Sequence, residues 1–426
     1  MITERLVRGI TFFNIFVGVI FFLFYFYQFI YVIIPFVKKP KAHASEVIHN
    51  IGILISARNE SAVIAQLLDS ISAQDYPKES LKVFVVADNC TDNTADIAKG
   101  CGATVYRRND PDMIGKGYAL DFLLRSIDKD IGIKEIDAFI VLDADNILDA
   151  GYVRAMNRML CDGYKITTSY RNSKNYSDNW ISAAYGLWFM REARFLNCSR
   201  YLIGSSCAVS GTGFLFSREL IEKFGGWKFF LLTEDIEFTV NCILSGEKVG
   251  YCEDAVLYDE QPITMRQSWN QRLRWSKGFL QVWSKYGRRL VRGIFKGSFS
   301  CYDMTMTVCP AYLVSVLSLI FDLVGIALCI VTRNYQLIGG LVALIVAALV
   351  EAYLLFLAMG AITLIKEWEK IYCKPHEKIG YLFSFPIFLI TYMPVALVAL
   401  FKKVEWKPIA HTRSVTIEDI VNDDRE

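Results

Sequence analysis

The chain has 426 residues, enough for one large domain with a membrane portion or for two to three small domains. Hydrophobic residues make up 53% of it, which is high for a soluble protein. Its 46 Lys and Arg residues nearly balance its 44 Asp and Glu residues, so no overall electrostatic attraction to nucleic acid is expected.

An apolar run begins near the N-terminus. Residues 10–37 carry no charged side chain. Because about 20 apolar residues are enough to cross a bilayer, we expect one transmembrane helix over residues 9–37. The run is too long for the apolar region of a signal peptide, and no small-residue cleavage site follows it.

Residues 50–262 have the pattern of a soluble α/β domain. Short apolar runs alternate with helical patterns, as in residues 51–56 followed by 60–72, and 137–145 followed by 150–160. This alternation predicts a parallel sheet that helices cover on both faces. Since ligands bind beyond the carboxyl ends of such strands, the polar residues there are the candidates for a site.

Polar clusters follow three of the predicted strands. They are residues 56–60 (SARNE), 87–94 (ADNCTDNT) and 142–146 (LDADN), and they bring carboxylates to the same edge of the sheet. The first two clusters could equally cap the helices that follow them. In the third, Asp143 and Asp145 lie one residue apart after an apolar run. They form a hard oxygen site suited to Mg²⁺ or Mn²⁺, which could hold a diphosphate.

The segment Gly115-Lys116-Gly117 begins a helical pattern. Its glycines permit close approach of the backbone, and a helix N-terminus favours an anion, so Lys116 could contact a phosphate. A solvated lysine in a turn is the alternative. Further along, residues 210–213 (SGTG) precede the triplet Thr233-Glu234-Asp235. This triplet either caps the next helix or supplies a carboxylate as a general base for a hydroxyl group.

The stretch SWNQRLRWSKGFLQVW, residues 268–283, belongs to a region of expected amphipathic interface helices, residues 263–300. As a helix it places Gln271, Arg274 and Trp275 on one face. Arginine can clamp a diphosphate, and an indole ring suits the apolar face of a sugar. A neighbouring stripe that could rest in the lipid interface consists of Trp269, Leu273, Leu280 and Trp283.

The ordered set Asp88, Asp143-x-Asp145, Thr233-Glu234-Asp235 and Gln271-x-x-Arg274-Trp275 resembles the processive glycosyltransferases of family 2. These are the cellulose, mixed-linkage β-glucan, chitin and hyaluronan synthases. The resemblance covers residues 50–285 and extends to the flanking membrane helices. It implies an α/β GT-A domain, Rossmann-like and cytosolic, with flanking transmembrane and interfacial helices. The chain departs from the family pattern at residues 88–92 (DNCTD), where a pair of adjacent Asp residues is usual, and at residues 209–213 (VSGTG).

The resemblance also implies roles for single residues. The nucleotide would be bound by Ala57, Glu60, Asp88, Lys116, Asp143, Gln271 and Arg274. Mg²⁺ or Mn²⁺ would be held by Asp145 and Asp143. Asp235 would be the catalytic base, accompanied by Glu234 and Thr233. The acceptor would contact Gly211, Thr212 and Trp275.

The implied function is a membrane-embedded inverting transferase. It would polymerise sugar from a UDP-sugar, UDP-glucose first, into a β-linked polysaccharide and secrete it. The implied partners are the UDP-sugar, the growing β-glycan and the lipid bilayer, with no nucleic acid. The implied location is the plasma (inner) membrane, with the catalytic domain in the cytoplasm. The alternatives are a UDP-N-acetylglucosamine-using synthase of the chitin, hyaluronan or poly-GlcNAc type, a single-sugar transferase to a lipid, and a transporter or channel with a nucleotide-sensing domain.

Residues 301–401 hold three further expected spans, 303–331, 337–365 and 380–400, which would form a glycan channel. Three full crossings would place the tail, residues 402–426, outside. The basic residues of this tail favour the inside: Lys402, Lys403, Lys407 and Arg413. Either residues 380–400, which contain two prolines, are re-entrant or interfacial, or the tail is external. An inside tail could approach the active site and gate it.

Two ionisable residues, Asp322 and Glu351, lie within the expected spans. Ionisable groups at such positions usually face protein or a polar cavity. They either line a path for a hydrophilic glycan or form buried polar contacts between helices.

Overall fold

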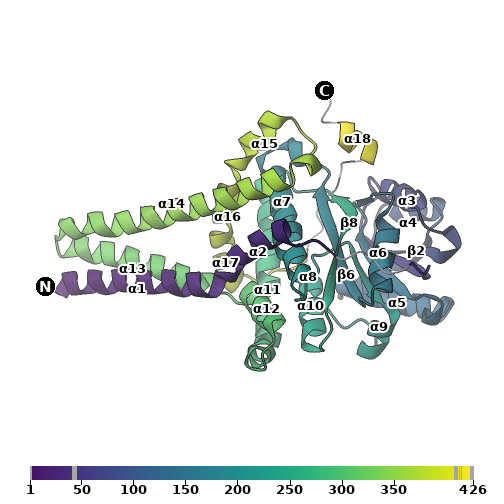
Figure 1. The fold of residues 1–426 in the computed structure, drawn as a ribbon, viewed down its shortest axis with the longest axis horizontal. Coiled ribbons are helices and arrows are strands. Elements are labelled where there is room, and N and C mark those ends of the chain that lie inside the picture. Colours follow the sequence, from purple (N-terminus) through teal and green to yellow (C-terminus); the bar gives the residue numbers. More distant parts are fainter. Residues whose placement is uncertain (1, 41–45, 407–410, 412, 414, 423–426) are drawn as a thin grey trace.

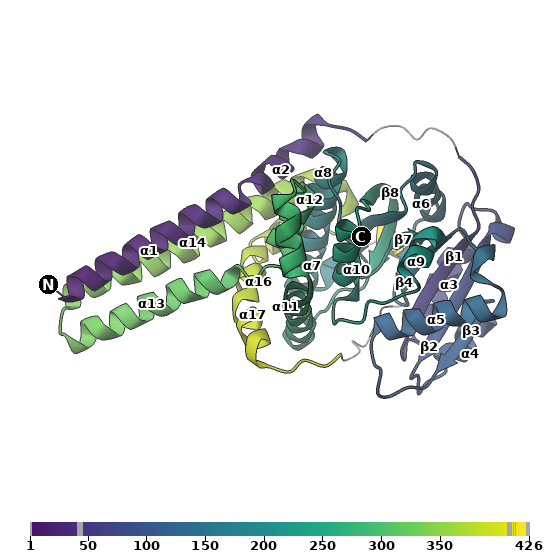
Figure 2. The same ribbon diagram turned by 90° about the horizontal axis from the view of Figure 1, so that it is seen from below.

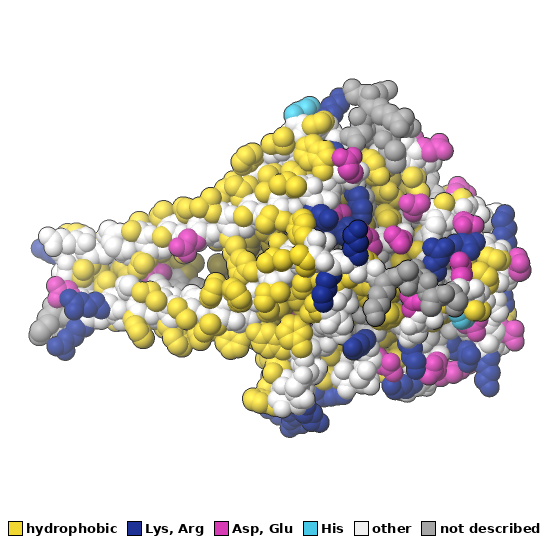
Figure 3. All heavy atoms as spheres, in the orientation of Figure 1, with side chains coloured by type: hydrophobic (Ala, Val, Ile, Leu, Met, Phe, Trp, Pro, Cys, Tyr) yellow, Lys and Arg dark blue, Asp and Glu magenta, His cyan; other side chains and the backbone are white. Residues whose placement is uncertain are grey.

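The computed structural model describes residues 2–40, 46–406, 411, 413 and 415–422. A broad α/β domain carries a finger of long helices that run side by side away from it (Figure 1). The helices of the finger are α1 (Ile2–Tyr25), α13 (Tyr312–Val331) and α14 (Tyr335–Lys366). Apolar side chains cover much of the finger and its base, whereas most charged side chains lie on the domain (Figure 3).

The described part of the domain contains an eight-stranded sheet with the order β3-β2-β1-β4-β7-β6-β8-β5. Its strands are β1 (Ile51–Ala57), β2 (Leu81–Asp88), β3 (Thr104–Arg108), β4 (Ala138–Asp143), β5 (Ile147–Leu148), β6 (Ile166–Ser173), β7 (Phe214–Ser217) and β8 (Val249–Asp259). Strands β1 to β4 are parallel, as predicted. The prediction of a wholly parallel sheet is wrong, because β7 runs antiparallel to β4 and β6, and β5 antiparallel to β8. The chain returns to the carboxyl end of β4, where the N–H of Gly213 donates to the carbonyl of Val141, and it therefore enters β7 from that end.

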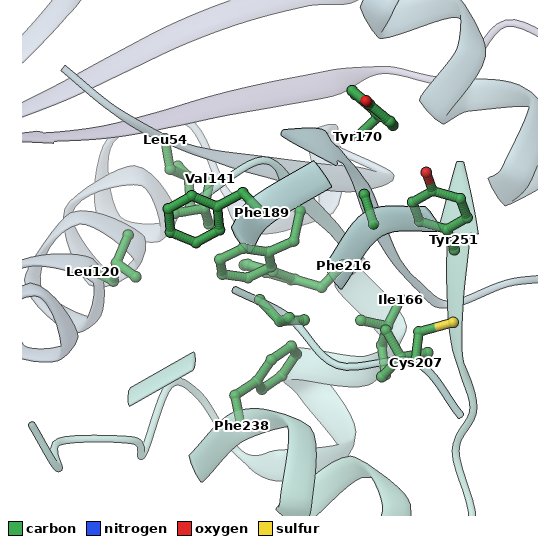
Figure 4. Close-up of a cluster of buried hydrophobic side chains, with 14 of the residues drawn as sticks. Leu54, Leu120, Val141, Ile166, Tyr170, Phe189, Cys207, Phe216, Phe238 and Tyr251 are labelled. Carbon is green, nitrogen blue, oxygen red and sulfur yellow. The ribbon is translucent and has the colours of Figure 1, made fainter. Parts of the chain in front are cut away.

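Helices cover both faces of the sheet, and alternate strand residues pack into separate cores. Leu54 and Val141 face one core, whereas Ile53 and Ile140 face the other. Figure 4 shows part of the first core, which includes Leu54 and Val141. The helices of the domain are α3 (Ile64–Ser72), α4 (Thr94–Gly100), α5 (Lys116–Asp130), α6 (Tyr152–Cys161), α7 (Trp180–Arg191), α8 (Cys198–Leu202), α9 (Arg218–Phe224) and α10 (Glu234–Leu244). A π-helical turn (Glu192–Asn197) joins α7 to α8.

Four segments are long and apolar enough to cross a membrane by length and composition: Thr3–Val37, Tyr312–Val331, Tyr335–Lys366 and Pro375–Phe401. The first comprises α1 and α2 (Tyr27–Val37). The second begins later than the predicted residue 303, because residues 299–308 form a separate helix, α12 (Phe299–Val308), and Pro310 follows it.

The last of these segments is broken into α15 (Pro375–Leu382), α16 (Phe385–Ile390) and α17 (Tyr392–Phe401). Both of its flanks touch the domain. Before the segment, Glu367 accepts a hydrogen bond from the hydroxyl of Tyr170 in β6 at 2.7 Å. After the segment, residues 402–406 line a cleft of the domain. Inside the finger, Asn14 donates to Asp322 at 2.8 Å, so Asp322 makes a polar contact between α1 and α13, while Glu351 is exposed.

Helix α11 (Met265–Phe295) crosses the base of the finger (Figure 2). The stripe expected to rest in lipid is largely covered by protein. Leu273 is buried against Val395 and Ala399 of α17, and Trp269 and Leu280 pack around the same contact. Leu273 therefore faces α17 and not lipid, because an apolar helix from the C-terminal region covers it, whereas Trp269 and Leu280 are half-buried and their contact with lipid stays a prediction.

A buried ion pair joins the domain to the base of the finger. The guanidinium of Arg200 in α8 donates to Asp303 in α12 at 2.7 and 2.9 Å. The hydroxyls of Tyr27 and Tyr31 in α2 donate to the same carboxylate at 3.0 and 2.7 Å. The side chains of the ion pair are both 3% exposed, so this one carboxylate fastens three helices together.

We expect Asp303→Ala to lower the free energy of unfolding by about 3–5 kcal/mol, because it leaves the Arg200 guanidinium buried without a counter-charge. Denaturant unfolding of the detergent-solubilised protein measures the loss. The matched control is Asp96→Ala, which breaks the exposed ion pair with Arg107 and should cost at most about 1 kcal/mol. Equal losses in the two variants would contradict the assigned role of Asp303.

Candidate active site

A cleft of about 500 Å³ lies at the edge of the sheet where β1, β2, β4, β6 and β8 end. The predicted site residues that line it are Ala57, Glu60, Asp88, Lys116, Asp143, Asp145, Gly211, Glu234, Asp235, Gln271, Arg274 and Trp275. Two further predicted residues, Thr212 and Thr233, do not line it. The structure therefore brings the candidates together from positions more than 200 residues apart, as expected for strands whose carboxyl ends share one edge.

Lys116 connects two of the predicted motifs. Its ammonium group forms an ion pair with Asp143 and donates to the carbonyl of Gly211 at 2.9 Å. The lysine side chain is only 11% exposed, which rules out the alternative of a solvated lysine. Gly117 next to it has to be glycine, because a Cβ there would lie 2.0 Å from the carbonyl oxygen of Phe229.

Thr212 and Thr233 support the site from behind. The hydroxyl of Thr212 accepts from the N–H of Asp143 at 2.9 Å and donates to Asn146 at 2.5 Å. It therefore fixes the loop of the paired aspartates from outside the cleft, and its predicted contact with a sugar acceptor stays a prediction. Thr233 is 2% exposed and faces Gly278 of α11. The motifs could not predict that these two side chains lie outside the cleft, because a motif does not show which way a side chain points.

Glu234 and Asp235 begin α10 at the floor of the cleft. Burial raises the pKa of both carboxyls, and the charge of Asp235 raises the pKa of Glu234 further. The backbone of Ile236 and the guanidinium of Arg274 act in the opposite direction on the pKa of Asp235. Arg274 and Lys116 likewise lower the pKa of Glu234, so both carboxyls face the same two cations in the cleft, and the assignment of Asp235 as the base stays a prediction.

Helix α11 forms the opposite wall with the three residues predicted to share a face. Arg274 donates to the carbonyl of Leu232 at 2.9 Å, just before Thr233-Glu234-Asp235. Among the described residues, the side-chain oxygen of Gln271 is buried without a hydrogen-bond partner, so it is available to a hydroxyl group of a ligand. The ring of Trp275 meets the rings of Tyr185 and Phe189 edge-on, with centroids 6.0 and 6.1 Å away.

Arg171 and Asp259 are functional candidates that the sequence analysis missed. Arg171 lines the cleft at the end of β6. Its guanidinium donates to the carboxylate of Asp259 at 2.8 Å and to the carbonyl of Ser210 at 3.2 Å. Its guanidinium stacks 3.8 Å from the centroid of the Phe189 ring. Burial raises the pKa of Asp259 to about 6. Asp259 and Glu260 also follow an apolar strand, so the rule applied to the other strand ends would have identified them.

Described residues of the tail reach the cleft, while a gating role of the tail stays a prediction. Residues 402–406 and His411 line it, while Lys407 lies outside the described residues. The guanidinium of Arg58 lies 5.3 Å from the Trp406 ring. Although burial lowers the pKa of His411, the carboxylates of Asp145 and Glu60 raise it to about 10.

Asp143 and Asp145 fit a divalent cation that binds together with a diphosphate. Asp145 is 3% exposed and lines the cleft, and one of its oxygens accepts from the N–H of Glu260 at 3.2 Å. Within the part of the chain that the structure describes, no three His, Cys, Asp or Glu side chains are already arranged around an ion. Mg²⁺ is usually held by one or two carboxylates plus substrate phosphates, which agrees with this arrangement.

Comparison with known proteins agrees with the geometry. A family model described as glycosyltransferase like family 2 matches residues 49–278. The β-monoglucosyldiacylglycerol synthase of Nostoc sp. (strain PCC 7120 / SAG 25.82 / UTEX 2576) is 25% identical over 286 residues, which are 65% of this chain and 59% of that protein. The poly-β-1,6-N-acetyl-D-glucosamine synthase of Staphylococcus aureus (strain COL) is 27% identical over 261 residues, 58% of each chain. This chain therefore spans about three fifths of the length of these two relatives.

One solved structure resembles nearly the whole chain. It is the mannosyltransferase PcManGT from Pyrobaculum calidifontis in complex with GDP-Man and Mn²⁺. The match has a TM-score of 0.53 at 18% identity and covers 94% of this chain and 99% of that one. At this identity the likeness concerns the fold, and it includes the helices outside the α/β domain.

Gly278 allows α11 to approach Thr233, and we expect Gly278→Ala to lower glycosyltransferase activity by about 100-fold. A Cβ at Gly278 would lie 2.5 Å from the Thr233 side chain, so α11 must move away from α10, and a displacement of about 1 Å can cost that much. Gly151→Ala is the control, since a Cβ there meets nothing within 4 Å. Equal activity of the two variants in a sugar-transfer assay would show that this close approach is dispensable.

Proposed function

This chain belongs to glycosyltransferase family 2 and has the GT-A fold, and on that basis we propose that it transfers a hexose from a UDP-sugar to build a β-linked polysaccharide at a membrane. The observation that carries the proposal is the shared cleft. A half-buried carboxylate that could act as a base, Asp235, lies in the same cleft as the paired aspartates, Lys116 and Arg274. UDP-glucose is the first donor to test. UDP-N-acetylglucosamine is the second, supported by the poly-N-acetylglucosamine synthase relative.

The nucleotide would bind over the ends of β1 and β2. Asp88 has one oxygen engaged by Arg108 at 2.6 Å and by Asn89 at 3.0 Å. Because the carboxylate lines the cleft, its other oxygen can accept from the imino group of uracil. Mg²⁺ or Mn²⁺, held by Asp145 with Asp143, would neutralise charge on the diphosphate.

The transfer is a single in-line displacement. Asp235 accepts the proton of an acceptor hydroxyl while that oxygen attacks the anomeric carbon. The bond from this carbon to the diphosphate oxygen breaks, and UDP leaves with the electron pair. Arg274 and Lys116 stabilise the negative charge on UDP. One displacement converts an α-linked donor into a β-linked product.

The acceptor would lie between the floor of the cleft and α11. Trp275 provides an aromatic surface for a sugar ring, and the unpartnered oxygen of Gln271 can accept from one of its hydroxyls. Gly211 brings the backbone close to the same position, and the nearby hydroxyl of Thr212 holds the loop. These features favour a glycan as the acceptor.

A single transfer to a lipid is the second candidate. It is supported by the β-monoglucosyldiacylglycerol synthase relative and by the packing of the finger. Helices α1, α13 and α14 contact one another, with Ile10, Cys329 and Leu341 buried between them. Three mutually packed helices fill the space between them with side chains, so the channel predicted for residues 301–401 would have to form elsewhere.

For the membrane arrangement we propose a cytoplasmic catalytic domain, because UDP-sugars are made in the cytosol. Helix α1 crosses the membrane once, and α13 and α14 form a hairpin that crosses and returns. Helices α15 to α17 lie at the cytoplasmic boundary, since both flanks of this segment touch the domain. The tail is then cytoplasmic, in agreement with its basic residues.

The proposal is tested by measuring UDP release from the purified full-length protein across a panel of UDP-sugars, with Mg²⁺ or Mn²⁺ present. We expect UDP-glucose to give the fastest release and a high-mass product that a β-glucanase degrades. A lipid-sized product would reject polymer synthesis and support the second candidate, the transfer of a single sugar to a lipid. The absence of UDP release with every sugar would reject the proposed activity.

We expect Asp235→Asn to slow sugar transfer by about 10²–10⁴-fold, because the variant cannot accept the proton of the acceptor hydroxyl. Binding of UDP, measured by calorimetry, should be unchanged. The control is Asp254→Asn, which alters an exposed carboxylate on β8 outside the cleft. Near-normal turnover of Asp235→Asn would remove this residue from the role of base.

A further inference from the structure

The C-terminal half of α11 carries a cluster of basic side chains. From residue 261 to residue 302 the sequence contains no Asp or Glu, although it contains nine Lys and Arg residues. Five of these cations follow residue 284, and all five are exposed. They recur three or four positions apart, which places them on one side of the helix. We call them the basic patch: Lys285, Arg288, Arg289, Arg292 and Lys296.

The described residues give the basic patch little negative charge. Lys285 forms an ion pair with Glu237, with 2.6 Å between the two atoms, and none of the other four cations forms an ion pair within the described chain. Like charges four positions apart, as at Arg288 and Arg292, destabilise a helix. Cations at a helix C-terminus offset the helix dipole, but this effect is confined to the last turn, and Arg288 and Arg289 lie before it. The basic patch therefore calls for an external anion.

Helix α12 places the basic patch at the base of the finger. It follows the patch directly and packs along α11. The hydroxyl of Tyr302 in α12 donates to the carbonyl of Phe24 in α1 at 2.6 Å, and α13 begins ten residues after Tyr302. The patch thus lies near the place where two of the long apolar helices leave the domain, which is the membrane boundary in the proposed arrangement.

Two exposed aromatic rings adjoin the basic patch. Phe295, at the end of α11, is 87% exposed, and Phe299, at the start of α12, is 42% exposed. Figure 3 shows Lys and Arg side chains beside apolar ones at the lower edge of the molecule, where α11 and α12 project in Figure 1. Basic side chains next to exposed aromatic rings are typical of a helix at the interface of an anionic membrane. An acidic protein would match the charges but would leave the rings at the edge of the apolar finger unexplained.

We propose that the basic patch binds the headgroups of anionic phospholipids at the cytoplasmic surface of the membrane. Lipid phosphates accept hydrogen bonds from the guanidinium and ammonium groups, while the rings of Phe295 and Phe299 enter the acyl chains beneath the headgroups. Since α11 also forms one wall of the cleft, bound lipid holds that wall at a fixed depth relative to the bilayer. The inference rests on the proposed membrane arrangement and not on the identity of the donor or the acceptor.

The test is native mass spectrometry of the detergent-purified full-length protein with equal amounts of dioleoylphosphatidylglycerol and dioleoylphosphatidylcholine. Wild type should retain phosphatidylglycerol in preference to phosphatidylcholine. The variant Arg288→Gln/Arg289→Gln/Arg292→Gln should bind phosphatidylglycerol about 100-fold more weakly, because each Lys or Arg near an anionic surface strengthens binding about fivefold. Phe295→Ala should weaken the binding by about 10-fold, because an apolar side chain then no longer leaves water.

The matched control is Lys78→Gln/Lys82→Gln/Lys99→Gln. It removes three exposed cations around β2 and α4, at the end of the molecule opposite the finger (Figure 1), and should bind phosphatidylglycerol as wild type does. Equal retention of the two lipids by wild type, or equal losses in the arginine and lysine variants, would overturn the inference and leave an acidic protein as the occupant of the patch. Unchanged binding by Phe295→Ala would overturn the insertion of its ring. None of these results alters the proposed function, which UDP release tests separately.

Discussion

Concentrated negative charge at one edge of the sheet is the constraint on which the rest of the structure depends. Several strands end in carboxylates at this edge, and a nucleotide diphosphate would add more negative charge. Buried carboxylates are tolerated only when cations or hydrogen-bond donors accompany them. The observed pairs are Arg108 with Asp88, Lys116 with Asp143, Arg171 with Asp259, and His411 with Glu60. Each cation comes from a different part of the chain, so neutralising this edge also assembles the cleft.

The sequence allowed much of the sheet and the site to be predicted, because the relevant signals are local. Apolar runs identified β1, β2 and β4, and the polar residues after each run identified one edge. Helical spacing placed Gln271, Arg274 and Trp275 together on α11, and all three line the cleft. The direction of β7, the lining role of Arg171 and the contact of the tail with Glu60 depend on the path of the chain through space. His411 and Glu60 are 351 positions apart, a separation that no periodic pattern records.

For the membrane region the sequence left two arrangements open, because hydropathy measures composition and not continuity. Residues 380–400 are apolar enough to span, yet the chain there breaks into short helices that pack against α11, α14 and one another. Helix α11 consequently has apolar partners on one side and the cleft on the other. Leu273 faces α17, whereas Arg274, next to it in the chain, reaches the segment before Thr233-Glu234-Asp235. A displacement of α17 would therefore act directly on this wall of the cleft.

The connection between α13 and α14 has a consequence for the far side of the bilayer. Only residues 332–334 separate these two helices. In the proposed orientation, so tight a bend offers no folded loop to the exterior between them. A partner that binds the α13–α14 hairpin would therefore have to recognise its lipid-facing flanks, in competition with acyl chains.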